Sequence, residues 1–388
     1  MKIIRLRVCV AKLGHLRKHA PRLFADPPNL IVTDSKTGFQ MPSLDGLRAL
    51  SIGLVFFAHS GMSAFPGGFG VTIFFFLSGF LITTLLRREY ERNGSISFRK
   101  FYLRRVLRIL PPFYLVLGGA LIATYLLDLP GTIDFSAVRA QALQYTNYWI
   151  ITHSFDGLPS GTGVFWSLAV EEHFYLLFPL LFVGLTRSGA RPDGQALVLL
   201  LTCAALLVWR VVLSSRLDFL DVMAPQRLEI ASDTRFDSIL FGCILALYGN
   251  PALDPSRFGE RRWKYVFFPL SVCGLLFSFL YRDEYFRDTF RYTLQGICLI
   301  SVFVCAVRYP NWLPMRPLNF RPIAFLGVLS YSLYLVHQVV IASVDHELAG
   351  FGGTTRAICA LAISLAIAWI LYIAVEKPCA RLRRRLRA

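Results

Sequence analysis

The chain has 388 residues, of which 55% are hydrophobic and 17% are charged, whereas soluble proteins carry about 25% charged residues. This composition excludes two ordinary soluble domains, a disordered chain, a coiled coil and a secreted disulfide scaffold. The 41 Lys and Arg residues outnumber the 24 Asp and Glu residues, which gives a net charge of +17. Nucleic-acid binding would explain the charge alone, but a multi-pass membrane protein with basic loops explains both properties.

Long apolar stretches recur along the whole chain. A helix that crosses a bilayer needs about 20 consecutive, mainly apolar residues. The sequence predicts about ten such helices, of which the one at 237–250 is short. Their expected ranges are 44–63, 66–86, 109–127, 164–186, 195–214, 237–250, 265–281, 291–307, 323–344 and 357–375. The predicted fold class is therefore an all-α integral membrane protein.

The distribution of basic residues predicts the orientation of these helices. If both termini are cytoplasmic, 31 of the 41 Lys and Arg residues lie in cytoplasmic segments and eight lie in outer segments. An excess of this kind on the inner side is typical of bacterial and eukaryotic membrane proteins. We therefore expect both termini to be cytoplasmic and the number of spans to be even.

The sequence divides into three parts. Residues 1–41 are predicted to be a basic cytoplasmic N-terminal extension, 42–378 the membrane domain, and 379–388 a basic cytoplasmic tail. The extension lacks the continuous apolar core and cleavage site of a signal peptide, so we expect an amphipathic segment on the inner membrane surface. A disordered tail and a misassigned start codon are the alternatives.

The cysteines and the largest outer segment give further expectations. The eight cysteines form no CxxC motif and lie in predicted spans or cytoplasmic segments, so we expect neither structural disulfides nor a metal site. A short interfacial helix is predicted near 136–151, in the largest outer segment.

Ionisable residues inside predicted spans are the main functional signal, because each is costly in lipid. Arg48 lies near the cytoplasmic entrance of the first span, and His59 follows 11 residues later, about 16 Å deeper along a helix. Eleven residues is close to three helical turns, so both side chains are expected on one face of a lined cavity. A buried neutral histidine can act as a general base; the alternative is a structural histidine bonded to a neighbouring span.

A basic cluster lies at the cytoplasmic edge of the third span. It contains Arg104, Arg105 and Arg108, of which the last two are neighbours at i,i+3 spacing. Guanidinium groups pair well with phosphates, so these arginines are candidates for holding a phosphorylated cytosolic cofactor. A topology anchor that touches lipid headgroups is the alternative.

Two adjacent carboxylates, Glu171 and Glu172, occur in the predicted fourth span. Ser167, Glu171 and Tyr175 share one face at i,i+4 spacing, whereas Glu172 points about 100° away. We expect one carboxylate to face the cavity and the other to tie helices together. His173 beside them is more typical of a structural residue.

Several weaker candidates surround these clusters. Ser78 is a possible cavity hydroxyl, Arg235 and Asp237 form a possible ion pair at the outer mouth of a span, and Lys377 is expected to pair locally. The substrate-binding candidates are Ser78, Trp166, Ser167, Arg235, Asp237, Tyr331 and His337.

These motifs together resemble the membrane acyltransferase 3 family, integral membrane O-acyltransferases that act largely on carbohydrates. The resemblance covers about residues 42–378 and rests on six segments in the family's order. The matching segments are Arg48 with His59, 75–83, 105–108, 166–179, 330–337 and 376–378. His173 stands where the family usually has Gln, and Thr72 where Asp is common. No hydrolase-like domain follows the last span, so we expect this domain or a separate partner to position the acceptor.

The resemblance implies a multi-pass enzyme of the bacterial inner membrane. It implies that acyl-CoA, most simply acetyl-CoA, is the donor substrate, with no permanently bound cofactor and no metal. Arg105 and Arg108 would hold the donor phosphates, assisted by Arg48 and Arg104. His59 would take the proton of an acceptor hydroxyl while a carboxylate of the 171–172 pair orients or charges the site.

The sequence is compatible with several acceptors and with a second class of function. The acceptor is expected to be a lipid-linked or exported glycan, such as lipopolysaccharide or exopolysaccharide, but peptidoglycan or a macrolide is also compatible. A proton-coupled transporter or flippase would also place His, Glu and Arg in its spans, although neither an inverted repeat nor paired broken helices are present. Direct transfer requires fewer steps than an acyl-histidine intermediate.

Overall fold

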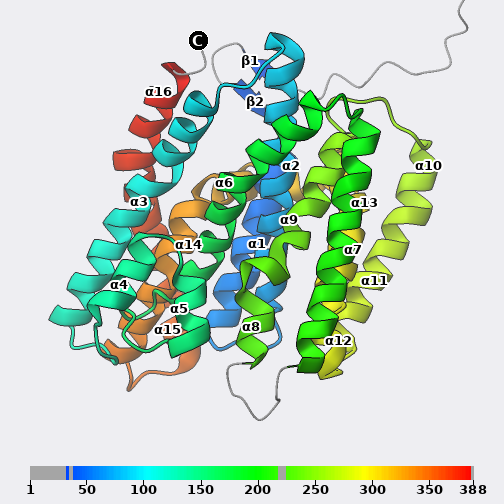
Figure 1. Ribbon diagram of the computed structural model, residues 1–388. Coiled ribbons are helices and arrows are strands. Elements are labelled where there is room, and N and C mark those ends of the chain that lie inside the picture. Colours follow the sequence, from blue (N-terminus) through cyan, green and yellow to red (C-terminus); the bar gives the residue numbers. More distant parts are fainter. Residues whose placement is uncertain (1–31, 35–37, 217–223, 386–388) are drawn as a thin grey trace, which may run out of the picture.

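The computed structural model describes residues 32–34, 38–216 and 224–385. Most of the predicted N-terminal extension and the last three residues of the chain lie outside these ranges. Apart from one small antiparallel sheet, the described residues form helices and loops (Figure 1). In that sheet β1 (Val32–Asp34) pairs with β2 (Gly38–Gln40), with Thr33 opposite Phe39. The all-α prediction is thus confirmed for the membrane domain.

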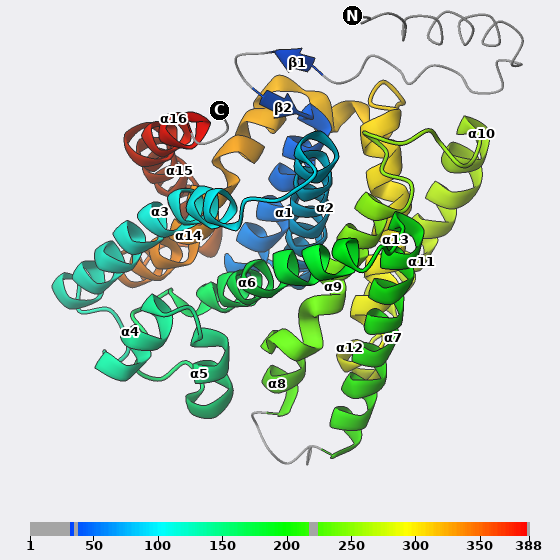
Figure 2. The same cartoon turned by 45° about the horizontal axis from the view of Figure 1, so that its top comes forward.

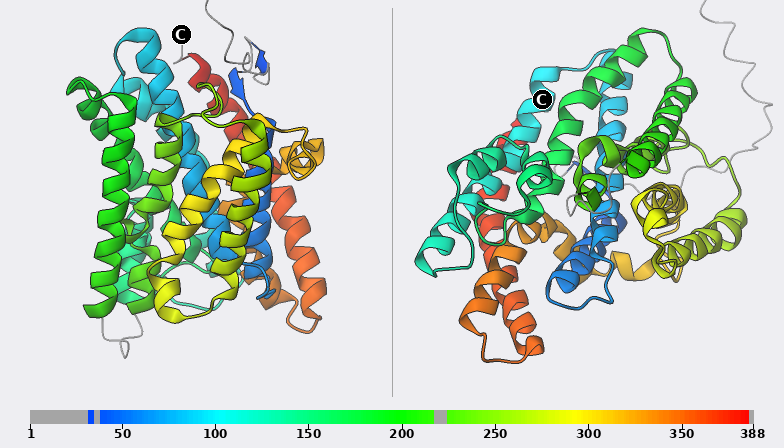
Figure 3. Two further views of the ribbon diagram at one scale, coloured as in Figure 1. Left: turned by 90° about the vertical axis from the view of Figure 1, so that its right-hand side faces the viewer. Right: turned by 60° about the horizontal axis from the view of Figure 1, so that its bottom comes forward.

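The main helices run along the height of the molecule (Figure 3). They are α1 (Pro42–His59), α2 (Gly67–Asn93), α3 (Phe98–Leu126), α6 (Trp166–Arg187), α7 (Pro192–Arg216), α9 (Ser232–Leu247), α11 (Phe268–Leu280), α13 (Arg291–Arg308), α14 (Arg321–Glu347) and α15 (Gly353–Leu371). Short elements connect or extend them: α4 (Phe135–Ala142), α5 (Thr146–His153), η1 (Gly163–Phe165), α8 (Ala224–Ile230), α10 (Glu260–Arg262), η2 (Trp263–Phe267), α12 (Glu284–Asp288), η3 (Arg316–Asn319), η4 (Tyr372–Glu376) and α16 (Lys377–Arg385).

Eight helical segments of the described chain are long and apolar enough to cross a membrane. Helices α1 and α9 lie outside that group, since α9 has only 16 residues and α1 carries Asp45 and Arg48. Both lie in the centre of the bundle, where neighbouring helices cover them (Figure 1). Together with the eight spanning segments, α1 and α9 make up the roughly ten helices that the sequence predicts.

The predicted interfacial helix near 136–151 is divided in two. Helix α4 ends at Ala142 and α5 begins at Thr146. Between them Gln144 has a φ of 60°, in the left-handed region that helices do not tolerate. The apolar pattern continues across this turn, so sequence periodicity alone does not reveal it.

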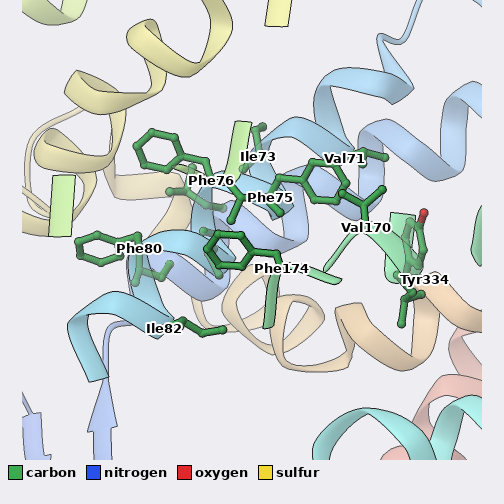
Figure 4. Packing of buried hydrophobic residues seen from close by; sticks show 14 of the residues in the cluster. Val71, Ile73, Phe75, Phe76, Phe80, Ile82, Val170, Phe174 and Tyr334 are labelled. Carbon is green, nitrogen blue, oxygen red and sulfur yellow. The ribbon is translucent and has the colours of Figure 1, made fainter. Parts of the chain in front are cut away.

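The centre of the bundle is closely packed where α2 and α9 cross. A Cβ on Gly79 would overlap the carbonyl of Ile239, and one on Gly242 would overlap the carbonyl of Phe76. Small residues let membrane helices approach this closely without a hydrophobic driving force. Around the crossing, Phe76, Phe80 and their neighbours form the apolar core (Figure 4).

The bundle has two distinct ends. Helix α1 begins and α16 ends beside the small sheet, at the end we call the basic end (Figures 1 and 2). Helices α4, α5, α8 and α12 lie at the opposite end, which we call the far end (Figure 1). Because the predicted cytoplasmic loops join helices at the basic end, the positive-inside rule assigns that end to the cytoplasm.

Candidate active site

Three arginines from two helices line a cavity at the basic end. Arg48 comes from α1, and Arg105 and Arg108 come from α3, which begins behind the N-cap Ser97. The cavity has a volume of about 320 Å³. Arg48 Nη1 lies 2.5 Å from Asp45 Oδ1, while no ion pair of Arg105 or Arg108 is found among the described residues. The carboxylates of Asp45 and Glu376 also line the cavity, so three guanidinium groups and two carboxylates surround it.

A second, deeper cavity of about 90 Å³ continues from the first. The two share the three arginines together with Leu81, Ser330 and Tyr331 as lining residues. The deeper part adds side chains from α2, α6 and α14, among them Ser78, Ser167, Glu171, Tyr175 and Tyr334. The two cavities therefore adjoin each other between the basic end and the middle of the bundle.

Glu171 is the carboxylate of this deeper cavity. Its Oε1 accepts a hydrogen bond from Ser78 Oγ at 2.8 Å, and its Oε2 accepts one from the Tyr175 hydroxyl at 3.0 Å. Ser167, Glu171 and Tyr175 all line the cavity, as their i,i+4 spacing predicts. Glu171 also links α6 to α2 through Ser78, so one residue performs both tasks that we expected the two carboxylates to divide.

Glu172 has a different environment. Its Oε1 is buried, and no hydrogen-bond partner for it exists in the described ranges. It does not line the arginine cavities. No hydrogen bond from Glu172 to another helix is found among the described residues, so its expected role in tying helices together stays a prediction.

The three arginines of the α3 cluster have different positions. The Arg105 guanidinium lies over the rings of Phe101 and Tyr175, at 5.7 and 5.3 Å from their centroids. Arg104 instead donates to Glu89 Oε2 at 2.7 Å and does not line either cavity. The structure thus separates Arg104 from the two arginines with which it was predicted to act, because it points to the α2 side of α3.

His59 lies at the far end of the bundle. It is the last residue of α1 and is exposed, so the expectation of a deeply buried histidine on the arginine face is wrong. Its Nδ1 lies 3.0 Å from Nε2 of His337, and the two rings are stacked with centroids 5.2 Å apart. His337, on α14, is fully buried.

The hydrogen bonds of His337 determine which nitrogens carry protons. Its Nδ1 lies 2.7 Å from the backbone oxygen of Tyr334, and a carbonyl can only accept, so Nδ1 is the donor. In a neutral His337 ring Nε2 is then an acceptor, and Nδ1 of His59 must donate to it. This leaves the lone pair of His59 Nε2 available to accept a proton.

Tyr334 connects the deeper cavity with the histidine pair. Its hydroxyl lies 2.6 Å from Ser167 Oγ and donates to the Val164 carbonyl at 2.9 Å. Its ring lines the cavity, and its backbone oxygen holds His337. Tyr334 lies in the hydroxyl-rich segment 330–337 but was not among the substrate-binding candidates, although its i,i+3 spacing from His337 on one helix was a usable signal.

Arg235 and Asp237 do not form the predicted ion pair. Asp237 Oδ2 lies 2.5 Å from Nη2 of Arg210 and accepts from Thr293 Oγ1 at 2.8 Å. Arg235 lies over the Tyr292 ring, 3.8 Å from its centroid, and donates to Thr72 Oγ1 at 3.2 Å. The charged partner of Asp237 comes from α7, which local spacing could not indicate. Arg235 and Asp237 are both fully buried, and their contacts are those of structural residues.

The structure also shows the surroundings of Tyr331, Trp166 and Lys377. Tyr331 lines both arginine cavities and donates to the Ile109 carbonyl at 2.7 Å. Trp166 packs edge to face against Phe75, outside the cavity lining. Lys377 lies over the rings of Trp369 and Tyr372, which is a local contact as expected.

His173 occupies a structural position. Its Nδ1 lies 2.7 Å from Ser232 Oγ, at the start of α9. This contact agrees with the expectation that His173 is a structural residue.

Comparison with known proteins identifies related sequences. A family model described as an acyltransferase domain matches residues 41–373. YrhL of Bacillus subtilis (strain 168), named as a candidate peptidoglycan O-acetyltransferase, is 32% identical over 355 residues, which are 87% of this chain and 54% of that protein. The peptidoglycan O-acetyltransferase OatA of Listeria monocytogenes serovar 1/2a is 30% identical over 313 residues, or 78% of this chain and 49% of that protein.

A third relative has similar identity and coverage. The O-acetyltransferase OatA of Staphylococcus aureus (strain NCTC 8325 / PS 47) is 30% identical over 322 residues, or 79% of this chain and 51% of that protein. The chain thus spans about half the length of these relatives. No solved structure matches it significantly.

Proposed function

This chain belongs to the membrane acyltransferase 3 family, and on that premise we propose that it acetylates hydroxyl groups of a cell-wall glycan. The names of its relatives support acetyl as the acyl group and peptidoglycan as the first acceptor to test. The observation that carries the proposal is the pair of adjoining cavities, which begin at three arginines and reach Tyr334, beside the histidine pair.

Acetyl-CoA is the donor that this cavity suits. Arg48, Arg105 and Arg108 face a space open at the basic end, and guanidinium groups bind phosphate oxygens in a bidentate manner. With the basic end in the cytoplasm of a bacterial inner membrane, the arginines would meet cytosolic acetyl-CoA. The acyl-pantetheine arm would then extend past Ser78 and Glu171 toward Tyr334.

His59 would act as the general base. Its Nε2 takes the proton from the acceptor hydroxyl while that oxygen attacks the thioester carbonyl carbon. The carbon–sulfur bond breaks, the thiolate of CoA leaves, and the imidazolium of His59 returns the proton to it. His337 holds the ring of His59 and fixes its tautomer.

Glu171 would contribute negative charge and two oriented hydroxyl groups to the path. It accepts hydrogen bonds from both Ser78 and Tyr175, which holds these side chains in place along the cavity. Because their protons are donated to Glu171, the two hydroxyls present oxygen acceptors to the path.

The test uses the purified chain in proteoliposomes, supplied with acetyl-CoA and a peptidoglycan oligosaccharide. We expect release of CoA thiol that depends on the oligosaccharide, and an acetylated product in mass spectrometry. His59→Ala should abolish both signals. His346→Ala is the matched control, because His346 is an exposed histidine elsewhere on α14.

The same assay separates acyl transfer from transport. A proton-coupled transporter would move the glycan across the vesicle membrane without releasing CoA thiol. Glycan uptake without thiol release, or an unaffected His59→Ala variant, would contradict the proposal.

A further inference from the structure

A separate pocket lies at the far end of the bundle and shares no lining residue with the arginine cavities. Its volume is about 490 Å³. It is formed by the loop that follows α3, the loop between α5 and η1, and Gln338 of α14. Nothing in the reaction described above uses these loops.

The loop between α5 and η1 is held firmly against α14. Gly161 has a φ of 73°, and a Cβ there would overlap the backbone of Gln338 and Val339. The Ser160 amide donates to Thr124 Oγ1 at 3.0 Å, and the Trp149 indole donates to the Asp156 carbonyl at 3.1 Å. The pocket is thus built by specific contacts.

The side chains of the pocket suit a sugar. Phe155 is 53% exposed and offers an aromatic face, on which the apolar face of a pyranose ring can stack. Thr132 and Ser160 supply hydroxyls, and Asp156 supplies an exposed carboxylate. Gln338 Oε1 is buried and lacks a hydrogen-bond partner within the described chain, so a ligand hydroxyl would satisfy it.

The charge of this pocket differs from that of the arginine cavity. Asp156 is its single ionisable lining residue, and no Lys or Arg is among the described side chains around it. Such a pocket disfavours the phosphates of CoA and accepts a ligand rich in hydroxyl groups. The two ends of the bundle therefore have complementary chemistry for a donor and an acceptor.

The pocket and the proposed base are linked through two successive residues of α14. Gln338 directly follows His337 along α14, and His337 contacts His59, which is exposed at the same end. We propose that this far-end pocket, centred on Phe155 and Gln338, binds the acceptor glycan and places one of its hydroxyls near His59. The proposal rests on the proposed function, because it assumes that the acceptor is a carbohydrate.

The first experiment measures binding without catalysis. The chain in nanodiscs is titrated with a tetrasaccharide of alternating N-acetylglucosamine and N-acetylmuramic acid, and saturation-transfer NMR reports the bound sugar. We expect Phe155→Ala and Gln338→Leu each to weaken binding about tenfold. Phe351→Ala is the control, since Phe351 is an equally exposed phenylalanine at 59% in another loop of the far end.

The second experiment measures acyl transfer with the same variants. Phe155→Ala should raise the KM for the tetrasaccharide about tenfold, while the KM for acetyl-CoA stays at the wild-type value. Phe155→Tyr, which keeps the aromatic face, should retain binding. Gel filtration and the melting temperature of each variant show whether it is folded.

Distinct outcomes separate this proposal from the proposed function. Unchanged binding in both Phe155→Ala and Gln338→Leu overturns the pocket assignment, as does a wild-type protein that does not bind the tetrasaccharide. Loss of binding in these variants, together with no CoA release by the wild type, supports the pocket and contradicts the acyl transfer. The pocket assignment is also overturned if all variants bind the tetrasaccharide equally and an added protein partner displaces it.

Discussion

His59 and His337 are 278 positions apart in the chain, and their ring nitrogens lie 3.0 Å from each other. One histidine is exposed and the other is fully buried. The buried ring is held by the Tyr334 carbonyl, so it can present a fixed acceptor to the exposed one. This pairing assigns His337 a positioning role in place of the substrate contact expected from sequence.

Replacing His337 by Ala should lower kcat about 100-fold without removing the base itself, because His59 loses its orientation. His337→Gln should recover part of the rate, since its amide oxygen can still accept from His59 Nδ1. The measurement is a pH–rate profile of CoA release. An unchanged rate and profile in His337→Ala would remove this residue from the mechanism.

Glu171→Gln should reduce kcat about 10- to 100-fold while the protein remains folded. The amide keeps the volume of the side chain but removes the negative charge, and only one of its two terminal atoms can accept a hydrogen bond. Ser78→Ala removes a single neutral bond, with a cost of about 1 kcal/mol, and should have a smaller effect. Single-turnover acetyl transfer and the melting temperature in detergent distinguish catalysis from stability. Equal effects of both variants would contradict the special role of the charge.

Arg108→Ala should raise the KM for acetyl-CoA about 10- to 100-fold, as expected for the loss of a charged hydrogen bond worth about 1.5–3 kcal/mol. Arg104→Ala is the matched control on the same helix, because Arg104 pairs with Glu89 outside the cavity. Its KM should equal that of the wild type. The wild-type KM should also increase with salt. A larger effect for Arg104 than for Arg108 would reverse our assignment of the donor site.

Asp237→Ala should destabilise the protein by about 3–5 kcal/mol, because it leaves the buried Arg210 without a counter-charge. Arg210 and Asp237 are both fully buried, and the Thr293 hydroxyl is hydrogen-bonded to both of them. A double variant, Arg210→Met with Asp237→Leu, should recover most of the loss. Thermal unfolding in detergent measures each step. If Asp237→Ala keeps its melting temperature and loses glycan binding, Asp237 is a substrate residue after all.

Much of the architecture follows from local sequence. Apolar length predicted the spans, and the i,i+4 spacing of Ser167, Glu171 and Tyr175 correctly placed them on one cavity face. The same holds for Arg105 and Arg108, whose i,i+3 spacing directs both toward the arginine cavity. These inferences succeed because the geometry of a single helix depends only on its own residues.

Contacts between helices required the tertiary structure. Sequence spacing could not show that Ser78 reaches Glu171, that Asp237 pairs with Arg210, or that Arg104 turns toward Glu89. The break at Gln144 and the exposed position of His59 were equally hidden. Thus the sequence by itself determined the fold class and the residues of each helical face, whereas the packing of helices decided which faces meet, since partners far apart in the chain leave no periodic signal.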